Sequence, residues 1–192
     1  MLLVVVAVLL AVAGVVVWWM STNHGGETGK YHASRVKNFC KSVDTKAFKK
    51  LTPKEDKRDA TSDVKQDPAV FTCSVPMASG DGSTDYLTVT LNAEARVASD
   101  VDDATEIFTS QLDAEKAKGY KVSKSKQTGD AAATVMVAPH ASPQVCRSHV
   151  RASNAVLSLT VLISGKGLSC ESDAPKLLLD VSQSTLDVMG SE

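Results

Sequence analysis

The sequence lacks both a charge imbalance and the short motifs that most directly indicate a function. Its 192 residues carry 21 lysines and arginines against 22 aspartates and glutamates, a net charge of −1. A nearly balanced charge gives no electrostatic case for nucleic-acid binding. There is no G-x-S-x-G elbow of a serine hydrolase, and Gly29-Lys30 lacks the remaining residues of a phosphate-binding P-loop. We therefore predict a protein that is not an enzyme and has no cofactor.

Cysteine and histidine are scarce, and their spacing does not favour a metal site. Zinc sites usually contain closely spaced ligand pairs, and no two cysteines of this chain form such a pair. No histidine has a second histidine four residues away or a cysteine suited to share a metal, so we interpret the histidines as surface residues. The cysteines are Cys40, Cys73, Cys146 and Cys170, and the histidines are His24, His32, His140 and His149.

The first twenty residues form a long apolar run without a charged side chain. At a helical rise of ~1.5 Å per residue, about 20 apolar residues cross the ~30 Å hydrocarbon layer of a bilayer. Trp18 and Trp19 lie at the end of the run, where indole rings favour the headgroup region. We predict that residues 1–20 are a transmembrane anchor in contact with the lipid bilayer. The polar, glycine-rich residues 21–30 then form a flexible tether.

A cleaved signal peptide is the alternative interpretation of this run. Signal peptides end at a small-x-small site, and residues 21–25 contain none. Ala11 and Ala13 fit the pattern, but cleavage there would leave residues 15–20 as an exposed apolar tail. No cysteine stands near the end of the run, which argues against a lipoprotein anchor. An uncleaved anchor is therefore favoured.

The side of the membrane on which the rest of the chain lies is indicated by two conflicting signals. Lys30, Arg35 and Lys37 follow the span while no charge precedes it, and the positive-inside rule would then put the domain in the cytoplasm. Large domains, however, cross membranes with little regard to charge. An even number of widely spaced cysteines behind an anchor is typical of two disulfides in an oxidising compartment. We predict an extracytoplasmic domain; four buried thiols in a cytosolic domain are the alternative.

Residues 31–192 have the length of one domain, and their patterns predict an α+β fold. Alternating apolar residues indicate strands, and apolar residues three or four apart indicate helices. The order predicts one antiparallel sheet with helices packed on one face. The expected elements are a helix at 45–51, a mobile loop at 54–67, strands at 70–75 and 86–92 around a turn at 80–83, a helix at 104–117, short strands at 120–122 and 134–138, a hairpin of 145–152 and 156–164, and a helix at 173–189.

One polar patch on the expected hairpin is a candidate binding surface. Arg147, His149 and Arg151 alternate with residues that face the core, so all three point to the opposite face. Ser158 and Thr160 of the second strand are expected on that same face. Such a surface suits a phosphate or carboxylate group of an envelope polymer or protein partner. An ordinary solvated strand face is the alternative.

The hairpin and the last helix also resemble a known group of proteins. Residues 146–157, followed by a hydrophobic strand, a cysteine and an amphipathic C-terminal helix, resemble actinobacterial extracytoplasmic sensor-like domains. Such domains are appended to membrane serine/threonine kinases, and related secreted lipoproteins have unknown functions. Residues 39–44, with Phe48 and Leu51, resemble the cysteine-led opening helix of the same group. The resemblance implies no enzymatic activity, and it implies the disulfides Cys40–Cys73 and Cys146–Cys170.

Two functions follow from these patterns. The favoured hypothesis is a non-enzymatic, membrane-anchored domain that binds an envelope ligand or a protein partner. The alternative is an accessory subunit of a larger membrane complex, because Ala11, Ala13 and Gly14 give the span a small-residue patch suited to helix packing.

Overall fold

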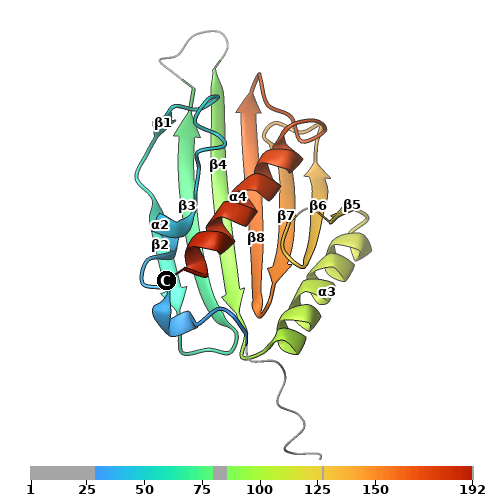
Figure 1. Ribbon diagram of the computed structural model, residues 1–192. Coiled ribbons are helices and arrows are strands. Elements are labelled where there is room, and N and C mark those ends of the chain that lie inside the picture. The colour runs from blue at the N-terminus through green and yellow to red at the C-terminus, as the bar shows by residue number, and fades with distance from the viewer. Residues whose placement is uncertain (1–28, 80–85, 127, 192) are drawn as a thin grey trace, which may run out of the picture.

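The structure is a computed structural model that describes residues 29–79, 86–126 and 128–191. Within these residues the chain forms an eight-stranded antiparallel sheet and a few helices (Figure 1). The elements in chain order are the 3-10 turn η1 (Ala33–Arg35), α2 (Phe39–Ser42), β1 (Lys54–Glu55), β2 (Asp59–Asp63), β3 (Ala69–Ala78), β4 (Leu87–Val97), α3 (Val101–Ala117), β5 (Lys121–Ser125), β6 (Ala131–Ala138), β7 (Gln144–Ala152), β8 (Ala155–Gly165) and α4 (Ala174–Met189).

The strand order is β1-β3-β4-β8-β7-β6-β5, with β2 also paired to β3. The last strand, β8, therefore lies in the middle of the sheet, between β4 and β7. The alternation that predicted the strands is present in β3 and β4, where every second residue is buried. The predicted hairpin is β7 and β8, which pair from Gln144↔Ile163 to Ala152↔Ala155. Ser153 turns the hairpin with a positive φ of 52°.

Most of the apolar core lies between one face of the sheet and helices α2 and α4. Leu157, Leu159 and Val161 of β8 point to this side and are fully buried. Leu178 and Val181 of α4 pack against the same cluster. The apolar stripe of α4 therefore has a continuous apolar sheet face to cover, as the period of its sequence predicts.

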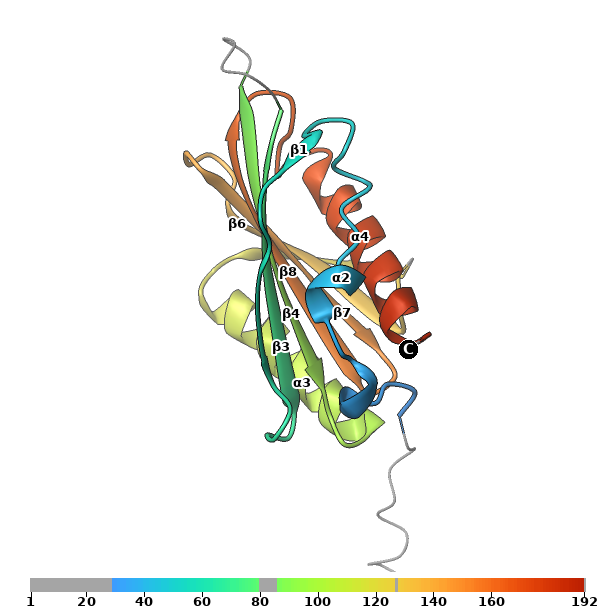
Figure 2. The same ribbon diagram turned by 90° about the vertical axis from the view of Figure 1, so that its left-hand side faces the viewer.

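The prediction that the helices pack on one face is wrong, because α3 lies on the other face of the sheet (Figure 2). Its Phe108 and Leu112 form a second, smaller cluster with Ala133 of β6 and Val156 of β8. These sheet residues alternate with those of the main core and so point the opposite way. The apolar contact of α3 is small because this second face presents few apolar residues. Half of that face is consequently left without a helix over it.

Two disulfides tie the ends of the domain to the sheet, and both have the pairing that the resemblance implied. Cys40 of α2 is bonded to Cys73 of β3, at a sequence separation of 33 residues. Cys146 of β7 is bonded to Cys170, just before α4, at a separation of 24 residues. All four cysteines are buried. Each bond therefore holds a core helix, α2 or α4, against the strand beneath it.

Two local predictions are wrong, both in the first third of the domain. Residues 45–51 form successive hydrogen-bonded turns instead of a helix, and the short helix α2 precedes them. Residues 54–67, expected to be a mobile loop, contain β1 and β2, which pair with β3. All five residues of β2 are exposed, so no alternation of burial could indicate this strand. The predicted turn at 80–83 lies outside the described residues.

Candidate functional site

The uncovered half of the second sheet face forms an open groove, with a floor of polar side chains from five neighbouring strands. The pairing register places these side chains in two rows, because residues that are partners on antiparallel strands lie side by side on one face. One row consists of Asp59, Ser74, Asn92, Thr160 and Arg147. The next row consists of Thr61, Thr72, Glu94, Ser158 and His149.

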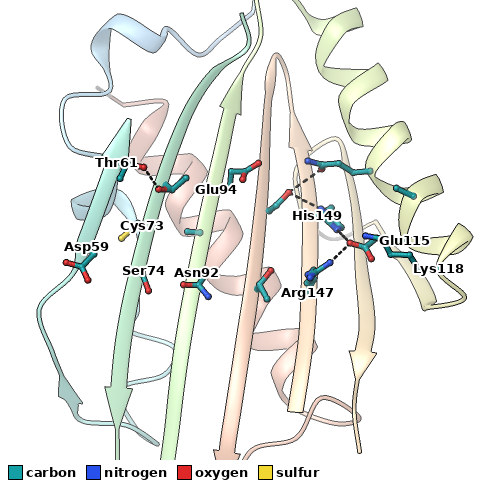
Figure 3. Close-up of a pocket in the computed structure, with 16 residues that line it drawn as sticks. Asp59, Thr61, Cys73, Ser74, Asn92, Glu94, Glu115, Lys118, Arg147 and His149 are labelled. Carbon is teal, nitrogen blue, oxygen red and sulfur yellow. Dashed lines mark hydrogen bonds and ion pairs between the residues drawn. The ribbon is translucent and has the colours of Figure 1, made fainter. Parts of the chain in front are cut away.

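Helix α3 forms the wall of the groove (Figure 3). The open groove has a volume of about 510 Å³. Asp100 starts this helix as its N-cap by accepting a hydrogen bond from the Asp103 amide at 2.9 Å. Seventeen residues follow before the chain turns at Lys118. Gln111, Ala114, Glu115 and Lys118 line the groove. Their spacing of three and four residues places them along one side of the helix.

The wall and the floor are joined by an ion pair between Glu115 of α3 and Arg147 of β7. Nη1 of Arg147 donates to Oε1 of Glu115 at 2.6 Å. The Glu115 side chain is only 6% exposed, whereas that of Arg147 is 29% exposed. The guanidinium therefore compensates a carboxylate that burial would otherwise disfavour.

His149 lies beside this ion pair and is buried beneath α3, with 6% of its side chain exposed. The interpretation of this histidine as a surface residue is therefore wrong. Burial lowers its pKa below the usual 6.5, against the opposing effect of the Glu115 carboxylate. Its Nε2 atom is 3.7 Å from Oε1 of Glu115. Neither Nε2 nor the Oε2 atom of Glu115 has a hydrogen-bond partner.

A chain of polar contacts joins His149 to helix α3. Ser158 Oγ is 2.9 Å from Nδ1 of His149 and 3.2 Å from Oε1 of Gln111. Either ring nitrogen of the neutral His149 can carry the proton, so the donor in the Ser158–His149 contact depends on the tautomer. Oε2 of Glu115 is an acceptor with either tautomer, and it has no hydrogen-bond partner among the described residues.

Serine, histidine and glutamate are the residue types of a hydrolytic triad, but the geometry of this group differs from a triad. In a triad the carboxylate accepts a hydrogen bond from the imidazole. Here Nε2 of His149 is 3.7 Å from Oε1 of Glu115, and that oxygen is paired with Arg147 at 2.6 Å.

The three residues of the predicted patch do not stay together. Arg147 and His149 line the groove together with Ser158 and Thr160, as the alternation predicted. Arg151 lies outside it: its guanidinium pairs with Asp130 at 3.3 Å and donates to the Ser153 carbonyl at 3.4 Å. Anion binding by this patch stays a prediction, with both arginines already paired to carboxylates.

Several groove residues were not predicted from the sequence. Asn92 and Glu94 of β4 come beside Thr160 and Ser158 only because β8 pairs directly with β4. Glu115 lies in the predicted helix at 104–117, and nothing in the sequence distinguished it from the other carboxylates of that helix as a groove residue. In the part of the chain that the structure describes, no group of three histidine, cysteine or carboxylate side chains is placed to hold a metal.

The predicted membrane span, with Trp18 and Trp19, and nearly all of the tether lie outside the described residues. Over the ranges that are described, no helix is both long and apolar enough to cross a bilayer. The anchor at 1–20, the tether at 21–30 and the accessory-subunit alternative thus stay predictions.

Comparisons with known proteins add one likeness. No family model matches the sequence, and no curated protein matches it. Among solved structures, the chain is similar to the extracellular domain of PknH from Mycobacterium tuberculosis, with a TM-score of 0.42 and 11% sequence identity over 72% of this chain and 85% of that chain. A likeness at this level does not assign the chain to a family, and the resemblance to kinase-appended sensor domains stays a prediction.

Proposed function

We propose that this protein is a non-catalytic, membrane-anchored extracytoplasmic domain, and that it binds a cell-envelope ligand in the groove beside α3. The two disulfides support an oxidising compartment, because such bonds persist outside the cytoplasm. The apolar run at 1–20 supports the anchor.

The observation that carries the binding proposal is a buried acceptor without a partner beside the groove. A buried polar atom without a partner costs about 1–3 kcal/mol, and such atoms are uncommon in folded proteins. Oε2 of Glu115 is such an atom, and the residue to which it belongs lines the groove. A ligand that reaches this atom and donates a hydrogen bond to it recovers that cost.

Two tryptophan variants on α3 test whether this groove is the binding site. Ala114 lines the groove and is exposed, so Ala114→Trp places an indole across the groove while leaving the core intact. Ala117 is exposed on the same helix but does not line the groove, so Ala117→Trp is the matched control. The measurement is saturable binding of labelled, fragmented cell-envelope polymers to the full-length protein in lipid nanodiscs.

We expect Ala114→Trp to weaken binding by about tenfold or more, which corresponds to about 1.4 kcal/mol, and Ala117→Trp to leave it unchanged. Equal binding by both variants would place the ligand elsewhere. Absence of binding by the unmodified protein would remove the proposal altogether.

A further inference from the structure

We infer that the ligand of this groove is a neutral, polyhydroxylated chain, a glycan segment, one of whose hydroxyl groups donates to Glu115. This inference rests on the proposed function and adds the chemical class of the ligand. It is supported by the charges of the groove, its hydrogen-bonding groups, the size of its apolar residues and the buried acceptor at its wall.

The charges of the groove do not favour an anion. Arg147 is paired with Glu115, and Glu94 accepts from the Nε atom of Arg96 at 2.7 Å. This leaves Asp59 and Lys118 as the charged lining residues without an ion pair within the described part of the chain. The two lie at opposite ends of the groove, Asp59 on β2 and Lys118 after α3 (Figure 3). With Asp59, Glu94 and Glu115 set against Lys118 and Arg147, the lining has no excess of positive charge that would attract a phosphate or a carboxylate.

The floor of the groove is suited to repeated hydroxyl groups. Serine and threonine hydroxyls and carboxamides each both donate and accept hydrogen bonds, as sugar hydroxyls do. Such groups stand on four adjacent strands, β2, β3, β4 and β8, which at ~4.8 Å per strand form an extended array. They are Thr61, Thr72, Ser74, Asn92, Ser158 and Thr160.

The groove offers little to a peptide or a nucleobase. A bound peptide needs pockets for its larger side chains, but the apolar residues that line this groove are small, namely Cys73, Ala93 and Ala114. Nucleobases are held mainly by stacking on aromatic rings. Among the residues that the structure describes, no phenylalanine, tyrosine or tryptophan lines the groove, and the His149 ring is buried, with 6% of its side chain exposed.

The buried carboxylate at the wall selects a donor group. Oε2 of Glu115 accepts but does not donate, so a ligand hydroxyl can bond to it, whereas an ether or carbonyl oxygen cannot. Because Oε2 is buried, a neighbouring side chain must shift before a ligand reaches it. A site built around acceptors of this kind discriminates strongly against a ligand that lacks the donor.

A chemical treatment of the ligand tests this class without requiring its identity. Fragmented envelope polymers are passed over an anion exchanger, and the neutral fraction is divided into three samples. One is left untreated, one is oxidised with periodate and reduced, which cleaves vicinal diols, and one is digested with protease. Binding of each to the full-length protein in nanodiscs is measured at low and at high salt.

We expect the neutral fraction to bind with little dependence on salt, periodate treatment to abolish binding, and protease digestion to leave it unchanged. Binding that survives periodate but not protease, or that resides only in the anionic fraction, would overturn the ligand class. If Ala114→Trp blocked that binding, the groove would remain the proposed binding site and only the ligand class would be wrong. Absence of binding by every fraction would instead remove the proposed function and this inference together.

Two matched pairs of variants locate the hydroxyl contacts. Thr160→Val removes a groove hydroxyl while keeping the shape of a strand residue, and Thr90→Val makes the same change on the same sheet face outside the groove. Because Thr160→Val loses one neutral hydrogen bond, we expect it to bind about 2- to 10-fold more weakly. We expect Thr90→Val to leave binding unchanged. Glu115→Gln replaces one carboxylate oxygen by an amide nitrogen that donates, with Glu106→Gln as its control on the same helix. We expect Glu115→Gln to weaken binding about 10- to 100-fold and Glu106→Gln to leave it unchanged. Equal binding by the two members of either pair would contradict the assignment of these hydroxyl contacts.

Discussion

Glu115 and Arg147 are the residues on which the contact between α3 and the sheet most depends. Removal of one partner of a buried pair leaves the other charge uncompensated, which costs more than removal of both. We expect Arg147→Gln to lower the free energy of unfolding by about 1–3 kcal/mol. The double variant Arg147→Gln, Glu115→Gln should regain part of that loss. Urea unfolding of both single variants and the double variant measures the coupling; strictly additive losses would show that the pair contributes nothing.

His149 makes stability depend on pH in a defined direction. Its burial lowers its pKa below 6.5 in the folded protein, so the unfolded chain binds a proton first as the pH falls. The free energy of unfolding contributed by this residue is complete above about pH 6.5 and is lost as the pH falls toward the lowered pKa. The loss is at most about 1.4 kcal/mol per pH unit.

Urea unfolding at about pH 7.5 and about pH 5.5 measures this effect. We expect His149→Gln to be less sensitive to pH than the unmodified protein. His140→Gln serves as the control, because that side chain is 80% exposed. The same pH dependence in the His149→Gln variant and the unmodified protein would show that His149 is not the titrating group.

At the scale of elements, Asn154 joins three segments of the chain at one end of the sheet. Its side chain accepts from the Tyr31 amide at 2.9 Å and donates to the carbonyls of Tyr31 and Ala98 at 3.0 and 2.7 Å. The residue thereby holds the segment around Tyr31 against the end of β4 and against the β7–β8 turn.

Because all three bonds are buried, we expect Asn154→Ala to lower the free energy of unfolding by about 2–3 kcal/mol. Asn92→Ala, at an exposed position of β4, should change it by less than about 0.5 kcal/mol. Thermal or urea unfolding compares the two. Similar values for both would show that the Asn154 bonds are replaced by water without cost.

The elements with clear periodicity could be predicted from sequence, and those without it could not. The stripes of α3 and α4 and the alternation of β4, β7 and β8 reflect burial on a single side, which a local pattern records. β2 is exposed along its whole length and pairs through its backbone, so its side chains carry no such pattern. The side of the sheet that α3 covers depends on contacts with Ala133 and Val156, which local sequence does not specify.

The candidate site could be predicted only for the part that lies on one hairpin. Arg147, His149, Ser158 and Thr160 share a face because strand alternation requires it. Their neighbours Asn92 and Glu94 belong to a strand paired with β8 across a long stretch of sequence. The burial of His149 follows from the position of α3, so its sequence neighbourhood alone indicated a surface residue.

At the scale of the whole molecule, the disulfides stabilise the domain by restricting the unfolded chain. Loops closed by bonds at separations of 33 and 24 residues are each expected to contribute about 3–4 kcal/mol in the chain-entropy model. We expect the paired variants Cys40→Ala, Cys73→Ala and Cys146→Ala, Cys170→Ala to lose about that much free energy of unfolding. Unfolding with and without a reductant provides an independent measure. An unchanged stability after reduction would contradict a structural role for these bonds.

The most direct test of the central claim is a map of the amide signals that change when the ligand is added. Isotope-labelled full-length protein in nanodiscs is titrated with the neutral fraction of envelope polymers, and its amide resonances are followed by NMR. We predict that the changes gather on β2, β3, β4, β8 and β7 and on the C-terminal half of α3, around Glu115 and His149. Changes confined to α2 and α4, on the opposite face of the sheet, would contradict the account.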